Sequence, residues 1–164
     1  MPSVKDVLKY IRINQGDLYS QLLYVERIIK QNSVLKVFTN FENKGFLCNY
    51  INSNCKKISF NSLDEKHFGE YDNFENVKFI NKPLENVNIQ EYDLIHLNCN
   101  HNFDDWCSYI KRILRNNPKF IILSNTKLKD TQTKCIINCI YKKKYEIIKI
   151  FKGYYGCVVF KLVK

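Results

Sequence analysis

Strand-like segments alternate with helical segments along almost the whole chain, and this alternation limits the possible folds more than any other feature. The strand-like runs are short and rich in β-branched and aromatic residues, and several lead into segments with apolar residues at helical spacing. This pattern predicts an α/β protein with a mostly parallel, doubly wound, Rossmann-like sheet. The expected strands lie at 35–40, 57–61, 77–82, 92–98, 120–124, 145–151 and 157–163.

Two segments define how this sheet should end. Residues 120–124 (FIILS) are an uninterrupted apolar run, as expected of a strand that is buried on both faces. The last two strand-like runs are joined by a tight turn with two glycines at 152–156 (KGYYG), so they should pair antiparallel. The predicted architecture is therefore five parallel strands followed by an antiparallel hairpin.

The helical segments are marked by cap residues, apolar stripes and stops. The clearest one follows the strand at 92–98: Asn102 is expected to cap it, Trp106 to face the core and Pro118 to end it. The chain is long enough for one core, and we expect a single domain over 1–164, with N-terminal helices in 1–33 and the sheet core in 34–164. Other helices are expected at 3–13, 17–31, 45–53 and 127–143, and at most a short or irregular one at 62–75.

Seven cysteines are scattered along the chain without a C-x-x-C pair. Cys135 and Cys139 are four residues apart, so they share one face of the helix expected at 127–143, and that face should point inward. Free cysteine in a reducing compartment behaves as a small buried hydrophobe. We therefore expect buried thiols and no metal site.

The chain has no sequence signal for a membrane or for export. No apolar run approaches the roughly 20 residues that cross a bilayer, and the first ten residues carry charges where a signal peptide needs an apolar core. These features predict an intracellular, cytoplasmic protein. The chain has no Ala and many Asn, Ile and Lys, which suits an AT-rich genome such as that of a large DNA virus or an AT-rich eukaryote.

The positive charge is concentrated in the last third of the chain. The formal net charge is +10, yet residues 1–110 hold 12 basic and 14 acidic side chains, and residues 111–164 hold 14 basic and 2 acidic ones. Such asymmetry favours a polyanionic partner such as RNA, or a partner protein. The alternative is a solvated basic face in a Lys-rich chain. The candidate contact residues are Lys142, Lys143, Lys144 and Lys149.

Residues 92–101 (YDLIHLNCNH) combine a strand with polar residues at its carboxyl end. In α/β proteins ligands bind just past the carboxyl ends of the strands, so Asn98, Asn100 and His101 are candidate catalytic residues. His101 could act as a general base near neutral pH, or it could simply orient the loop before the helix. His96 lies in mid-strand and is expected to pack in the core.

This segment resembles one branch of the class I S-adenosylmethionine-dependent methyltransferases, in which the fourth strand reads YDLIHIDGDHSY and the fifth ends in Asp-Asp-Thr. Here 92–96 match, Asn98 and Asn100 stand in place of the two Asp, and 124–126 (SNT) stand for Asp-Asp-Thr. The order of elements is similar over about residues 17–163. The resemblance implies a seven-stranded sheet of order 3-2-1-4-5-7-6 with the last strand antiparallel.

The resemblance also implies a cofactor, S-adenosylmethionine, and residues that contact it. In this fold the cofactor lies against a glycine-rich turn after the first strand, and an acidic residue at the end of the second strand holds the ribose hydroxyls. Here the turn keeps one glycine, Asn61 stands in place of the acid, and Glu42 is a candidate contact for the methionine ammonium of the cofactor. The implied cofactor-binding residues are Thr39, Asn40, Glu42, Gly45 and Asn61.

Two functions remain open from the sequence. The chain could be a methyltransferase with an altered cofactor pocket. Alternatively, it could be a catalytically inactive relative that acts as a binding or regulatory subunit and contacts RNA through its basic third. Some relatives hold a divalent metal with carboxylates after the fourth and fifth strands. The neutral amides of Asn98, Asn100 and Asn125 are poor ligands for a hard cation, so no such metal is expected.

Overall fold

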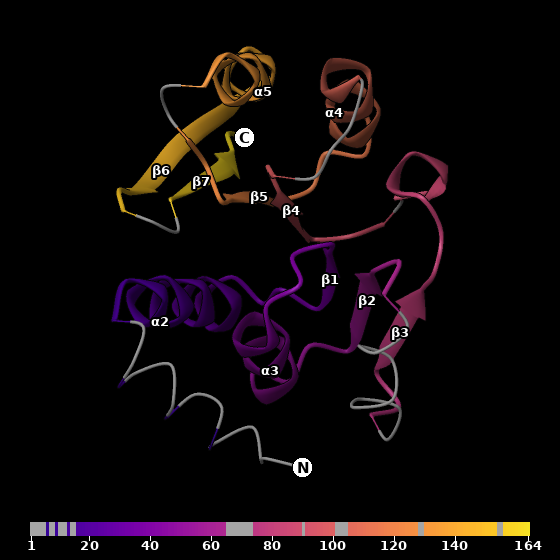
Figure 1. Ribbon diagram of the computed structural model, residues 1–164, viewed down its shortest axis with the longest axis vertical. Helices are drawn as coiled ribbons and strands as arrows, with labels where there is room; N and C mark the ends of the chain where they lie inside the picture. Colours follow the sequence, from indigo (N-terminus) through magenta and orange to yellow (C-terminus); the bar gives the residue numbers. More distant parts are fainter. Residues whose placement is uncertain are drawn as a thin grey trace. The chain divides into compact units, whose positions relative to one another are not determined.

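The computed structural model describes residues 6, 9, 13, 16–64, 74–89, 91–100, 105–127, 130–153 and 156–164 (Figure 1). The chain divides into two compact units, Met1–Val87 (unit 1) and Asn88–Lys164 (unit 2). The single domain expected over 1–164 stays a prediction.

Unit 1 is a parallel three-stranded arrangement with two described helices. Strand β1 pairs parallel with β2, and β2 pairs parallel with β3. The strand expected at 57–61 has the bounds that were predicted, because an apolar centre between polar ends defines where it starts and stops. The elements are α2 (Gly16–Gln31), β1 (Lys36–Thr39), α3 (Lys44–Asn52), β2 (Lys57–Asn61), β3 (Val77–Ile80) and the 3-10 turn η2 (Leu84–Asn86).

Helix α2 packs through an apolar stripe, as its spacing predicts. Leu18, Leu22, Val25 and Ile29 recur at helical spacing and all are buried. The side chain of Asn49 in α3 donates an Nδ2 hydrogen bond of 3.0 Å to the carbonyl oxygen of Leu22, and this bond ties α3 to α2. Together these contacts give unit 1 its core.

Unit 2 contains the antiparallel hairpin that the sequence predicts. Strands β4 and β5 pair parallel, whereas β7 pairs antiparallel with both β5 and β6. Every residue of β5 is buried, as expected of its uninterrupted apolar run. The elements are β4 (Leu94–Asn98), α4 (Trp106–Leu114), β5 (Phe120–Ser124), α5 (Thr131–Tyr141), β6 (Tyr145–Phe151) and β7 (Cys157–Leu162).

The strand order of the protein is β3-β2-β1-β4-β5-β7-β6, which confirms the predicted order and the predicted antiparallel seventh strand. Two helix starts differ from the sequence prediction. Helix α4 is capped by Asp105 rather than Asn102, because the Asp105 carboxylate accepts a hydrogen bond of 2.9 Å from the Ser108 amide. Helix α5 begins at Thr131, where Asp130 caps it in the same way.

Some predicted features fall on residues that the structure does not describe. Most of the helix expected at 3–13 lies outside the described residues, as do residues 65–73 of the segment at 62–75 and the candidate base His101. Within the described ranges, no helix combines the length and the apolar character that crossing a membrane requires. The intracellular location stays a prediction.

Gly156 is held against the backbone of Thr126 in unit 2, where the Thr126 amide donates a 2.9 Å bond to the Gly156 carbonyl. A Cβ at residue 156 would lie 2.4 Å from the Thr126 carbonyl oxygen and 2.8 Å from its Oγ1. We therefore expect Gly156→Ala to lower the free energy of unfolding by about 2 kcal/mol, measured by urea denaturation.

Gly16→Ala is the matched control, because a Cβ at residue 16 would meet nothing within 4 Å. This variant should change the stability by less than about 1 kcal/mol. Equal stabilities for the two variants would contradict the close approach at Gly156.

Candidate functional site

The turn after β1 is a closed network of hydrogen bonds that leads into α3. Thr39 Oγ1 accepts a bond of 3.1 Å from the Phe41 amide, and the Asn43 amide donates a bond of 2.8 Å to the Phe41 carbonyl. Asn43 Oδ1 then accepts bonds of 3.0 and 3.3 Å from the amides of Gly45 and Phe46. Side-chain oxygens therefore satisfy the turn, which in the resembling family is glycine-rich.

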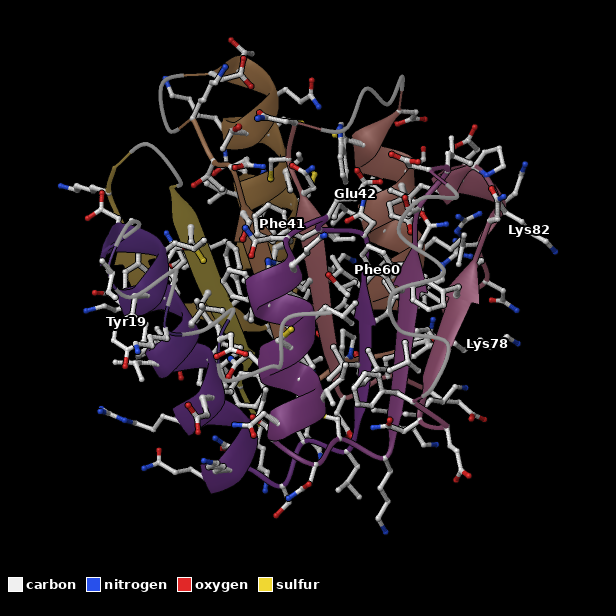
Figure 2. The ribbon with its side chains drawn as sticks, turned by 60° about the horizontal axis from the view of Figure 1, so that its bottom comes forward. Tyr19, Phe41, Glu42, Phe60, Lys78 and Lys82 are labelled. Carbon is white, nitrogen blue, oxygen red and sulfur yellow. The ribbon has the colours of Figure 1, made fainter. Side chains whose placement is uncertain are left out.

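The bulky residue of this turn packs inward. Phe41 is 5% exposed, and its ring meets the ring of buried Phe46 edge to face at a centroid distance of 5.4 Å. Glu42 and Lys44 are exposed. Figure 2 shows Phe41 and Glu42 beside the end of α3 at which the turn enters. The outer side of the turn thus carries charged side chains rather than an aromatic ring.

The amino-terminal end of α3 is already bonded to its own cap. Free N–H groups at a helix start can bind the carboxylate or phosphate of a ligand. Here Asn43 occupies two of them, those of Gly45 and Phe46. An anion at this helix end would have to displace the Asn43 side chain, so the carboxylate of a bound ligand needs other donors.

Glu42 is joined to the end of β2 through Ser62. The Ser62 hydroxyl donates a hydrogen bond of 2.6 Å to Glu42 Oε1, and the same Ser62 oxygen accepts a bond of 3.0 Å from the Asp64 amide. Ser62 is buried and Glu42 is exposed, so a rigid hydroxyl orients a solvent-facing carboxylate. This bond brings an acidic group to the place where the strand itself ends in a neutral Asn61.

The side chain of Asn61 is hydrogen-bonded to the backbone at the end of β3. Its Nδ2 donates bonds of 2.9 Å to the Ile80 carbonyl and 2.8 Å to the Lys82 carbonyl, and its side chain is buried. An amide group has two N–H donors, so both are used here. A carboxylate, being an acceptor only, could not make either bond. The asparagine at this position therefore has a structural task that an acid could not perform.

The end of β4 in unit 2 is organised around Asn98. Its Oδ1 accepts a bond of 3.0 Å from the Asn100 amide and one of 2.9 Å from the Nδ2 of Asn125, which follows β5. Two carboxylates could not make the second bond, because neither would supply a donor. The two amides satisfy each other, and Asn100 remains exposed.

The buried titratable groups of unit 2 are held neutral. His96 is fully buried with Nε2 2.6 Å from the Ser124 hydroxyl oxygen, and burial lowers the pKa of its imidazole to about 3. This confirms the core role predicted for His96. Burial likewise raises the pKa of the Cys99 and Cys157 thiols to about 12, so neither is a ready nucleophile.

The structure thus places the five predicted cofactor residues at the ends of β1 and β2 or in the turn and helix that follow β1. Thr39, Asn40, Gly45 and Asn61 are buried, and only Glu42 of the five is exposed. Sequence reasoning missed Ser62. The sequence signal for Ser62 was its hydroxyl, which comes directly after the strand and next to the position where an acid is expected.

No protein-family model matches the sequence, and no curated protein does so either. Solved structures do match. N-methyltransferase NodS from Bradyrhizobium japonicum WM9 has a TM-score of 0.69 at 9% identity, over 92% of this chain and 99% of that chain. Magnesium protoporphyrin IX methyltransferase (ChlM) from Synechocystis PCC 6803, with bound SAM, has a TM-score of 0.66 at 12% identity, over 99% of this chain and 86% of that chain.

The SAH-bound methyltransferase PaMTH1 from Podospora anserina also matches, with a TM-score of 0.63 at 14% identity, over 100% of this chain and 89% of that chain. At such identities the likeness is one of fold. The resemblance drawn from residues 92–101 is therefore confirmed at the level of the fold.

Replacing Asn61 with the acid typical of this strand end should destabilise the protein. Asn61→Asp removes two donors and sets a negative charge against two carbonyl oxygens. We expect the free energy of unfolding to fall by about 3 kcal/mol, and by less in Asn61→Ala, measured by urea denaturation.

Asn86→Asp, at an exposed position of η2, is the matched control and should leave stability nearly unchanged. If Asn61→Asp were as stable as the wild type, the two bonds from Asn61 would not have the structural role assigned to them.

Proposed function

We propose that this chain, which has the fold of class I S-adenosylmethionine-dependent methyltransferases, binds S-adenosylmethionine at the carboxyl ends of β1 and β2 and is a methyltransferase. The observation that carries the proposal is the 2.6 Å hydrogen bond from Ser62 to Glu42. It holds an exposed carboxylate beside the end of β2, where the resembling family uses an acid. The matched ChlM structure contains SAM and the matched PaMTH1 structure contains SAH, which supports the same ligand class.

Glu42 suits the ribose better than Asn61 does. The two ribose hydroxyls are donors, and an ionised carboxylate is an acceptor-only group with two oxygens. Both donors of Asn61 bond to the backbone. Hydrogen bonds to a charged acceptor are stronger than neutral ones, so moving the acid from the strand to the turn would preserve the strong form of the contact.

The other predicted cofactor residues would shape the pocket. Thr39 fixes the first residues of the turn through its hydroxyl, and Gly45 lies at the start of α3, where its amide donates to Asn43 Oδ1. The Phe41 ring packs inward on Phe46, which leaves the outer side of the turn to the ligand. Asn40 is buried beside them.

The residues proposed for the reacting end do not require a metal. Methyl transfer can proceed by holding the sulfonium and the nucleophile in line. Asn98 already accepts two hydrogen bonds, so its part is to fix the loop. Asn100 is exposed and would meet the methyl acceptor, and His101 would take the proton that the acceptor loses.

Titration calorimetry with S-adenosylmethionine and S-adenosylhomocysteine on the reduced protein tests the cofactor. We expect micromolar binding that Glu42→Gln weakens about tenfold, because the amide keeps the size of the side chain and loses its charge.

Glu85→Gln, which neutralises an exposed glutamate of η2, is the charge-matched control and should bind as the wild type does. An absence of binding at millimolar ligand would end the proposal. Equal binding by Glu42→Gln and the wild type would remove Glu42 from the site.

A second candidate is an inactive relative that serves as an RNA-binding or regulatory subunit. Two observations favour it: the neutral Asn98–Asn125 pair stands where relatives place carboxylates, and the lysines proposed for a polyanion are exposed. Lys142, Lys143 and Lys144 form the turn between α5 and β6, and Lys149 lies on β6, 5.4 Å from the ring of Phe151. Lysines next to an aromatic ring suit a nucleic-acid strand.

Single-stranded RNA binding measured against salt concentration tests this candidate. Changing Lys142, Lys143 and Lys144 together to Gln should weaken binding and reduce the slope of log K against log salt by about 2. The control changes three exposed lysines of unit 1, Lys56, Lys57 and Lys78, to Gln. An equal loss in the two triple variants would mean that only net charge matters and would rule out a defined surface.

A further inference from the structure

Three thiols meet on the two helices of unit 2. Cys107 lies on α4, and Cys135 and Cys139 lie one turn apart on α5. The Cys107 sulfur is 2.7 Å from that of Cys135 and 3.7 Å from that of Cys139, and all three sulfurs lie within 4.8 Å of one another. Figure 1 shows α4 and α5 as neighbouring helices of this unit.

This placement corrects the sequence prediction that Cys135 and Cys139 point inward. The buried face of α5 is made by Thr133, Ile136 and Ile140, and the two cysteines lie beside it. Cys135 is exposed, while Cys107 and Cys139 are half-buried. The other four cysteines are buried, so the three that reach solvent are also the three that cluster.

Packing alone does not account for the cluster. A cysteine in a core stabilises the fold by burying apolar surface. These thiols are exposed or half-buried, so they bury little apolar surface. A single disulfide would join two of the sulfurs and would not explain why the third lies beside them. Three convergent thiols are the donor set of a soft metal ion.

We propose that Cys107, Cys135 and Cys139 bind one Zn²⁺ ion as three thiolates, with the fourth position open to water or to a ligand from another molecule. In a tetrahedral site with Zn–S bonds of about 2.3 Å, neighbouring sulfurs lie about 3.8 Å apart. The Cys107–Cys139 distance of 3.7 Å already fits. The Cys107–Cys135 pair must open by about 1 Å, which a rotation of the exposed Cys135 side chain provides.

The three sulfurs lie close enough together for one cation to replace their protons. Three thiolates at these distances would repel one another strongly, and a divalent ion removes that repulsion. Binding should therefore release protons and weaken as the pH falls.

This site is independent of the proposed methyltransferase function. Its ligands come from helices α4 and α5, and none of them is among the residues proposed for methyl transfer. The proposal can thus fail while cofactor binding succeeds, and the reverse also holds.

Titration of the reduced, metal-free full chain with Co²⁺, a coloured substitute for Zn²⁺, tests the proposal. We expect one equivalent to bind, with thiolate-to-cobalt charge-transfer absorption and the visible bands of tetrahedral Co²⁺, and Zn²⁺ should displace it. Changing Cys107, Cys135 or Cys139 to Ser should each weaken binding at least about tenfold. Cys48→Ala, which removes a buried thiol of α3, is the control and should bind fully.

Thiol alkylation of the wild type gives a second readout that needs no variant. Zn²⁺ should protect Cys107, Cys135 and Cys139 from iodoacetamide, as mapped by peptide mass. Absence of the charge-transfer band, or a band that survives all three Ser changes, would overturn the proposal. So would an air-oxidised Cys107–Cys135 disulfide in a chain that binds no cobalt, since the cluster would then be a redox pair.

Discussion

Backbone groups at the ends of strands and helices must find hydrogen-bond partners, and in this protein asparagine side chains provide many of them. Asn43 caps α3, and Asn61 bonds two carbonyls after β3. Asn76 donates to the Cys55 carbonyl at 2.7 Å, and Asn49 to that of Leu22 at 3.0 Å. Asparagine side chains thus bond to backbone groups at strand ends, at a helix start and between two helices.

The end of β2 shows how one asparagine can hold the fold together. Here Asn61 serves the fold, and Ser62 brings the Glu42 carboxylate to the same end of β2. In the proposed function, the structural task falls to Asn61 and the ligand contact to Glu42.

The strands could be predicted from the sequence, because apolar runs and a glycine turn are local signals, whereas their order was implied by the resemblance to a known family. The start of α4 could not, since Asn102 and Asp105 both suit a cap and only the structure shows the bond to Ser108. The role of Asn61 depends on carbonyls 19 and 21 residues away. The thiol cluster likewise needs Cys107, which is 28 residues from Cys135, so the four-residue spacing alone gave the wrong face.

The buried His96 makes the protein sensitive to acid. Its pKa is about 3 in the folded chain and 6.5 in the reference state, so between these values the unfolded chain binds more protons. The free energy of unfolding therefore rises with pH across this window. The contribution of His96 is fully present above about pH 6.5 and is lost as the pH falls toward 3. At pH 5 the protonation of this one residue lowers the free energy of unfolding by about 2 kcal/mol, which is a large share of the total for a typical domain. Acid therefore weakens the fold through the protonation of a single buried imidazole in β4.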